Sequence, residues 1–280
     1  FQEKIQTTHI ADQIPFFDYS GPPKDVDHGV SYFIQKFKDS LVDNELRDEF
    51  IHVACATADT STLEHIFETA RAIVMGDLTG HNAITTTNTK RVTTTVPAHD
   101  IIHSEAVNSS AIDRELERAR QQEGEKAKVV FLGSAGSGKS TLIEQTKHYS
   151  DNERNLDSGI NYNMLQQDDG DIAVLHKTTG VVMQRHRYDG IFFEMYEVGS
   201  HLLQSIQKWI HYFDHVDVLV FVAALSEYDE TIVVQGEEIN KLLRTIQLFQ
   251  SISMNRPPAS TPSIVLILNK KDMFQEKIQT

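Results

Sequence analysis

The sequence has little cysteine, little positive charge and no long apolar run. Cys55 is the single cysteine among 280 residues, which excludes an internal disulfide and is typical of a reducing compartment. The formal net charge is −14, and such an acidic surface repels phosphate backbones and anionic lipid, so we expect no nucleic-acid partner. No apolar run is long enough to span a bilayer, and no secretory signal precedes the first predicted element. We therefore expect a cytoplasmic protein without a transmembrane segment.

The composition that is present, 40% hydrophobic and 24% charged, is ordinary for a globular protein with a real core. Amphipathic stretches such as residues 27–43 and 61–74 have the period of helices. Strands and helices in alternation favour the α/β class, with a mostly parallel sheet covered by helices. The buried strands are predicted from short apolar stretches rich in β-branched residues, at 50–55, 129–133, 192–196, 218–224 and 264–268.

Three polar segments interrupt this alternation. Residues 84–109 are rich in threonine and poor in large apolar side chains, which predicts a linker. Residues 110–127 are highly charged and predict a solvated helix or a partner-binding arm. Residues 150–171 are acidic and punctuated by Gly, Asn and Asp, and we expect a surface loop there.

The stretch "GSAGSGKST" lies between a predicted strand and a predicted helix, and it predicts a phosphate loop. Glycines let backbone N–H groups turn toward phosphate oxygens, and the start of a helix adds positive potential. Lys139 is predicted to reach the β- and γ-phosphates, and the Ser140 hydroxyl to bind Mg²⁺. The predicted phosphate-binding residues are Gly133, Gly136, Ser137, Gly138, Lys139, Ser140 and Thr141.

The stretch "LNKKD" ends the last predicted strand and predicts a guanine box, Asn269–Asp272. The Asp272 carboxylate can accept two hydrogen bonds from guanine, whereas adenine offers no such pair of donors. A second stretch, "ACAT", also follows a strand, and a backbone N–H of Cys55, Ala56 or Thr57 can meet guanine O6. We therefore expect Asn269, Lys270 and Asp272 to select guanine.

These motifs, together with "KTTG", "KWIHYF", "FVAALSEYDE", "NKKDMFQEKI" and "FFDYSGP", resemble the α subunit of heterotrimeric G proteins over nearly all of the chain. The resemblance implies a P-loop GTPase (Ras-like) fold with a mostly parallel six-stranded sheet and helices on both faces. It implies a signalling switch that binds GTP or GDP with Mg²⁺, and contacts with Gβγ or an effector through the switch segments. It also implies possible peripheral attachment, through partners, at the inner face of the plasma membrane.

The order of the motifs is circularly permuted relative to that family. "ACAT" precedes the phosphate loop, "NKKD" comes last, and the chain both begins and ends with "FQEKIQT". We assign residues 1–83 to the C-terminal part of one GTPase domain, 84–109 to a linker, 110–127 to an N-terminal-like helix and 128–280 to the N-terminal part. A natural permutation, a slice of a tandem array and an engineered chain would all produce this order. We expect one copy of "FQEKIQT" to occupy the helix after the guanine box and the other copy to be frayed.

Several features depart from the family pattern. The resemblance implies a large helical domain between Lys139 and Thr178, but too few residues separate them to contain it. It also implies an arginine just before Thr178 that stabilises charge on the γ-phosphate, and residues 171–177 contain none. The end of the helix at 61–74 departs from the receptor-reading terminus of the family, so we do not expect receptor coupling.

The stretch "EVGSH" stands where the resemblance implies a "DVGGQ"-like box. Glu197 replaces an aspartate associated with Mg²⁺, and with Ser140 and Thr178 it forms the predicted metal site. Gly199 and Ser200 are assigned to the nucleotide site, although Ser200 replaces a glycine that faces the γ-phosphate.

His201 replaces the glutamine that orients the attacking water, and it is the predicted catalytic residue. Two hypotheses follow from these departures. The first is a slow GTPase switch; the alternative is a pseudo-GTPase interaction module, in which His201 is an inert surface residue.

Overall fold

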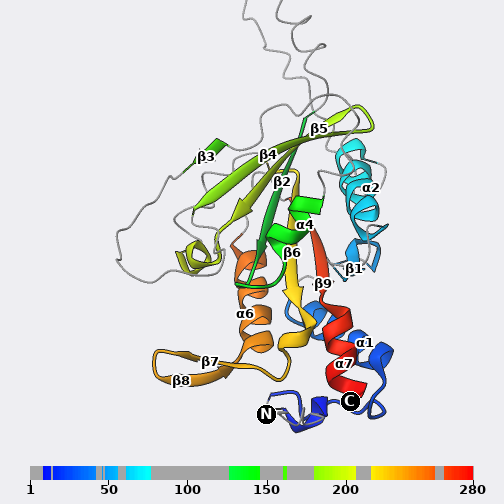
Figure 1. Ribbon diagram of the computed structural model, residues 1–280, viewed down its shortest axis with the longest axis vertical. Helices are drawn as coiled ribbons and strands as arrows, with labels where there is room; N and C mark the ends of the chain where they lie inside the picture. Colours follow the sequence, from blue (N-terminus) through cyan, green and yellow to red (C-terminus); the bar gives the residue numbers. More distant parts are fainter. Residues whose placement is uncertain are drawn as a thin grey trace, which may run out of the picture.

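A seven-stranded sheet forms the centre of the computed structural model (Figure 1), which describes residues 9–13, 15–41, 46, 48–55, 61–76, 126–145, 160–162, 180–205, 216–255 and 262–279. Its strands lie side by side in an order far from that of the chain, so segments from both halves of the sequence share one sheet. The order is β1 (Ile51–Val53), β9 (Ser263–Asn269), β6 (Val218–Ala224), β2 (Lys126–Gly133), β5 (Ile191–Val198), β4 (Val181–Tyr188) and β3 (Ile160–Tyr162).

Strands β1, β9, β6, β2 and β5 run parallel, and they correspond to the apolar stretches that predicted strands. All residues of the central strand β6 are buried, because helices cover both faces of a parallel sheet. The predicted α/β class and mostly parallel sheet are thus confirmed. Strand β2 begins at Lys126, so Lys126 and Ala127 lie in the strand rather than in the helix predicted for residues 110–127.

An antiparallel edge extends the sheet beyond β5. Strand β4 pairs with β5 from Val181↔Val198 to Tyr188↔Ile191, and β3 pairs with β4. Strand β4 was not predicted from the sequence, and only two of its eight residues, Met183 and His186, are buried. A loop was expected where β3 lies.

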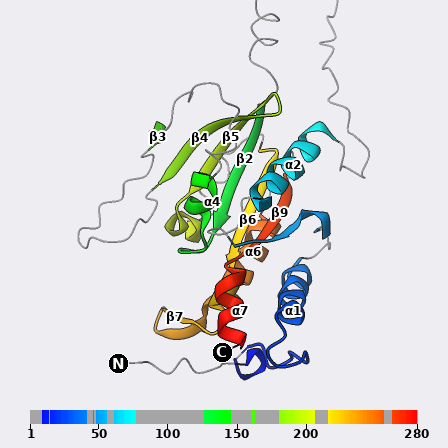
Figure 2. The ribbon, with the colours of Figure 1, turned by 45° about the vertical axis from the view of Figure 1, so that its right-hand side comes forward.

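Helices α1 (Val26–Asp39), α2 (Ser61–Met75), α4 (Lys139–Gln145) and α6 (Lys241–Met254) pack on the sheet (Figures 1 and 2). On one face, the rings of Phe37, Phe249 and Phe221 join α1, α6 and β6. Elsewhere Phe67 of α2 contacts Phe193 of β5 at a centroid distance of 5.3 Å. Each helix buries the apolar side that its sequence pattern predicts.

Residues 274–279 of the C-terminal copy of "FQEKIQT" lie within α7 (Lys271–Gln279), which packs beside α1 (Figure 2). Phe274 has 0% exposure and contacts the rings of Phe33 and Tyr228. Its ring also lies close to Gly29, where a side chain would collide with it at 2.9 Å. The N-terminal copy, residues 1–7, lies outside the described residues.

A separate hairpin, β7 (Thr231–Val234) and β8 (Glu237–Asn240), projects from the body of the molecule (Figure 1). Gln235 and Gly236 form its turn with positive φ angles of 53° and 88°, the conformation of a two-residue type I′ hairpin loop. In the described part of the chain, every helix is too short or too polar to cross a membrane.

Candidate functional site

The predicted site residues gather where the parallel strands end. Strands β2, β6 and β9 are neighbours, and their register pairs Gly133 with Val222 and Ala224 with Asn269. The loops that follow these three strands therefore meet at one edge of the sheet. The crevice outside the carboxyl ends of parallel strands is where open α/β sheets bind ligands.

The phosphate loop, residues 133–141, links β2 to α4. Gly133, Gly136 and Gly138 have φ angles of 146°, 76° and 97°, a region that side chains disfavour. At Gly133 a Cβ atom would also lie 2.1 Å from the Val222 carbonyl oxygen of the adjacent strand. The glycines are therefore needed for the shape of this turn.

The Lys139 side chain is buried inside the loop, with 6% exposure. Its ammonium group donates to the carbonyl oxygens of Gly133 at 2.9 Å and Ser134 at 2.8 Å. Burial lowers the pKa of Lys139 to about 8, and the negative charges of Glu197 and Glu227 oppose that shift. A cation held at the centre of a loop of backbone N–H groups is suited to binding phosphate.

Two of the three predicted metal ligands meet at the end of β5. The Ser140 hydroxyl donates to Glu197 Oε1 at 2.5 Å, so the longer glutamate side chain reaches the serine directly. Hydroxyl and carboxylate oxygens are the ligands that Mg²⁺ prefers, and this pair fits that ion. The third predicted ligand, Thr178, lies outside the described residues.

No group of three His, Cys, Asp or Glu side chains with the geometry of a metal site occurs in the described part of the chain. An ion at Ser140 and Glu197 would therefore take its other ligands from elsewhere, including phosphate oxygens of a bound nucleotide.

Gly199, Ser200 and His201 follow β5. The Gly199 N–H donates to the Gly180 carbonyl oxygen at 2.8 Å, which ties the end of β5 to the residue just before β4. Ser200 begins the 3₁₀ helix η4 (Ser200–Ser205), and His201 is exposed within it. The turn thus presents His201 to solvent, a few residues after Glu197 in the chain.

The guanine box is bonded to the phosphate loop. Asn269 has 0% exposure, and its side-chain amide donates to the Ser137 carbonyl oxygen at 2.8 Å. Lys270 has a positive φ of 60° and begins the turn into α7, because its carbonyl oxygen accepts from the Phe274 N–H. Asp272 lies in the first turn of α7.

The stretch "ACAT" meets the guanine box from β1. The Lys271 N–H donates to the Ala54 carbonyl oxygen at 3.1 Å, and the Ala54 N–H donates to Leu268 at 2.8 Å. Cys55 follows at once and is partly buried. The structure therefore brings Cys55 beside Asn269 and Lys270, while Ala56 and Thr57 lie outside the described residues.

Glu227 is a site residue that the sequence analysis missed. It ends the 3₁₀ helix η6 (Leu225–Glu227), which follows β6 directly, and it is only 6% exposed. Burial raises the pKa of its carboxyl group, and the charges of Lys241 and Lys270 oppose that shift. The position after a buried central strand was its one signal in the sequence.

Comparison with known protein families gives a match over the second half of the chain. Residues 159–280 match the family model of the G-protein alpha subunit. The matched segment contains Glu197, Gly199, Ser200, His201 and the guanine box, and it begins after the phosphate loop.

Proposed function

On the premise that residues 159–280 are those of a G-protein alpha subunit, we propose that this chain is a guanine-nucleotide-binding signalling switch. It binds GTP or GDP with Mg²⁺ and hydrolyses GTP slowly. The fold supports this proposal, since the site lies at the edge of a parallel sheet where nucleotides bind.

One contact carries the proposal, the hydrogen bond from the buried Asn269 amide to the Ser137 carbonyl oxygen. It holds the guanine box and the phosphate loop in a fixed relation. A nucleotide would contact the guanine box with its base and the phosphate loop with its phosphates. Because these two parts of the site are already oriented, the entropic cost of binding is lower.

The proposed roles follow from position and chemistry. Asn269, Lys270 and Asp272 read guanine together with Cys55, Ala56 and Thr57. The phosphates are held by Gly133, Gly136, Ser137, Gly138, Lys139, Ser140, Thr141, Gly199 and Ser200. Ser140, Thr178 and Glu197 hold Mg²⁺, which when bound neutralises charge on phosphate oxygens.

We assign His201 the role of orienting the attacking water, since its imidazole is exposed beside the end of β5. Residues 171–177 supply no arginine to the γ-phosphate. Such an arginine is worth roughly a thousandfold or more in rate, so we expect slow hydrolysis.

A specific observation favours a second candidate, a pseudo-GTPase that binds nucleotide without turnover. The Ser140 hydroxyl is hydrogen-bonded to Glu197, so each of these predicted Mg²⁺ ligands already has a partner in the protein. A site that prefers this contact to the metal would bind nucleotide and leave it intact.

We also propose that the chain is a circularly permuted single domain, with the boundaries given by the sequence analysis. Residues 274–279 of the C-terminal "FQEKIQT" copy lie in α7, and Ile278 lines the same cavity as His9 and Ile10. This proximity supports the proposed permutation. Gβγ or an effector would bind through the switch segments, in the cytoplasm or at the inner face of the plasma membrane, and we do not expect receptor coupling.

Single-turnover hydrolysis of bound GTP, with Mg²⁺ and with His201→Ala as the matched variant, tests the proposal. We expect slow hydrolysis that decreases in the variant while GTP affinity is unchanged. Stable GTP in both proteins would establish the pseudo-GTPase, and equal rates would remove His201 from the mechanism. Displacement of GDP by ATP as readily as by GTP would contradict guanine selection.

A further inference from the structure

Glu227 places a buried carboxylate beside the proposed nucleotide site. It lies just beyond the pair Ala224↔Asn269, where β6 and β9 both end. The phosphate loop follows β2, the other neighbour of β6. Glu227 therefore lies between the phosphate loop and the guanine box, at the sheet edge where the nucleotide is proposed to bind.

Charged and polar groups from three surrounding elements influence the ionisation of this carboxylate. They are Ser134 in the phosphate loop, Lys270 in the guanine box and Lys241 at the start of α6. The negative charge of Glu227 also acts on Lys139, and the negative charge of Glu230 acts on Glu227.

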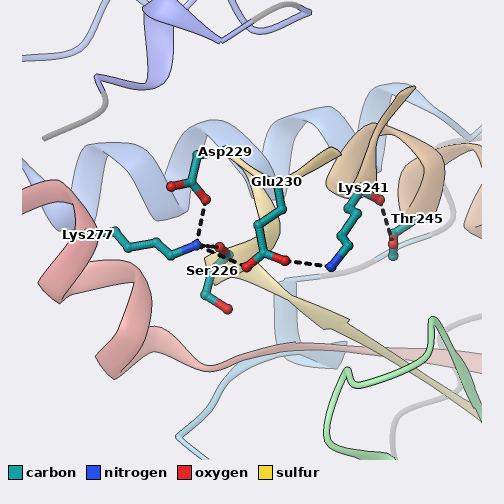
Figure 3. A network of polar contacts seen from close by, with 6 residues as sticks. All are labelled: Ser226, Asp229, Glu230, Lys241, Thr245 and Lys277. Atoms are coloured by element: carbon teal, nitrogen blue, oxygen red, sulfur yellow. Dashed lines mark hydrogen bonds and ion pairs between the residues drawn. The ribbon is translucent and has the colours of Figure 1, made fainter. Parts of the chain in front are cut away.

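The lysines around Glu227 donate hydrogen bonds to other acceptors. Lys241 donates to Glu230 at 2.6 Å, and Lys277 donates to Asp229 at 2.6 Å and to Glu230 at 3.1 Å (Figure 3). The ammonium of Lys139 donates to backbone carbonyl oxygens of the phosphate loop. Glu230 is thus neutralised by direct partners, whereas the charges of Lys241 and Lys270 act on Glu227 through space.

We propose that Glu227 is a positioning residue that weakens nucleotide retention, because its buried negative charge opposes the phosphates and must be protonated for tight binding. The inference rests on the proposed function, since it concerns the same site. A nucleotide brings several negative charges to Lys139, and that lysine then no longer balances Glu227. Binding therefore takes up a proton at Glu227, and acidification strengthens it.

The raised pKa of Glu227 agrees with the sign of this effect. A carboxyl group that is already hard to ionise when buried becomes harder to ionise as phosphate approaches. Affinity should thus increase as the pH falls through the pKa of Glu227. Replacing Glu227 by glutamine removes the charge at nearly constant volume, so it should tighten binding at neutral pH.

The test measures the affinity and release rate of a fluorescent GDP analogue from pH 5 to pH 8 in four proteins: wild type, Glu227→Gln, Glu227→Asp and Glu230→Gln. We expect Glu227→Gln to bind about tenfold more tightly at pH 7.5 and to release more slowly, with the difference shrinking as the pH falls. Glu227→Asp keeps the charge and should keep the wild-type profile. Titration of the GDP phosphates is common to all four proteins and cancels in the comparison.

Glu230→Gln is the matched control, because Glu230 is a glutamate on the same segment with direct lysine partners. It should lower the melting temperature and keep an affinity that increases on acidification, because Glu227 can still ionise, whereas Glu227→Gln should lose that increase. A merely structural Glu227 would give weaker binding in Glu227→Gln, and that result, or a difference independent of pH, would overturn the inference. If Glu227→Gln fails to fold, a wild-type affinity that does not increase on acidification overturns it instead. If all four proteins fold and none binds the analogue at any pH, the proposed function fails as well.

Discussion

Gly133 and Gly136 have the same residue type and both have positive φ, yet their surroundings differ. At Gly133 an added Cβ would lie 2.1 Å from a backbone oxygen of β6, whereas at Gly136 no atom lies within 4 Å. The first glycine is required by both the backbone conformation and the neighbouring strand. The second is required by the backbone conformation alone.

We predict that Gly136→Ala lowers the free energy of unfolding by about 1 kcal/mol, the cost of a side chain at positive φ. Gly133→Ala should lower it by about 3 kcal/mol, since β2 and β6 must also separate. Urea unfolding of the two variants measures both values. Equal losses would contradict the close approach of the phosphate loop to β6.

Some residues of the site could be predicted from the sequence and others could not. Lys139, Asn269 and Glu197 were predicted as site residues because short motifs specify their chemistry, and the structure places all three at one sheet edge. The direct bond between Asn269 and Ser137 was not predicted, because it joins residues far apart in the chain. Glu227 was missed because glutamate is usually exposed, so its residue type does not indicate burial.

Among the elements, α7 has a distinctive position, since six of its residues, 274–279, repeat the sequence of residues 1–6. In the structure Phe274 and Ile278 of α7 are buried, and Lys277 holds Asp229 and Glu230 (Figure 3). The identical residues Phe1, Ile5 and Lys4 could make the same contacts only by displacing α7.

Phe274→Ala and Phe1→Ala form a matched pair that tests which copy fills the core. We predict a loss of about 3–5 kcal/mol for Phe274→Ala, as for other fully buried aromatic residues. Phe1→Ala should change the free energy of unfolding by less than about 0.5 kcal/mol. Chemical denaturation provides both values, and similar losses would mean that the N-terminal copy is also packed in a core.

The elements that sequence reasoning missed share a physical cause. Strand β4 belongs to the antiparallel side of the sheet and buries only Met183 and His186, so it lacks the continuous apolar run that marked the parallel strands. The hairpin β7–β8 lies outside the sheet, and its burial pattern is also partial. Its two-residue turn at Gln235 and Gly236 was the one signal that could have revealed it.

At the scale of the molecule, the two ends of the described chain lie together. The Lys24 ammonium donates to the Gln279 carbonyl oxygen across a sequence separation of 255 residues. His9, Ile10 and Ile278 line one cavity of about 150 Å³ with Tyr19 and Lys24. The end of α7 is therefore beside the residues that would follow it if the proposed permutation is reversed.

We predict that a reordered chain, residues 110–280 followed directly by residues 8–83, folds to the same structure. Its melting temperature should lie within a few degrees of the original, and its GDP affinity should be unchanged, because no contact of the described core is removed. Residues 8–280 in the original order are the control for loss of the first "FQEKIQT" copy. A reordered chain that remains unfolded while this control folds would contradict the proposed permutation.

Because β1 pairs with β9, the strands cannot assemble in the order in which they are synthesised. Ile51–Val53 pair with Leu266–Leu268, so a ribosome delivers β1 long before its neighbour exists. The apolar sides of α1 and α2 remain exposed while β2, β6 and β9 are synthesised. Exposed apolar surface of this kind makes nascent chains aggregate or bind chaperones. The segment that contains α1, β1 and α2 is therefore expected to pack last, once β9 has been synthesised.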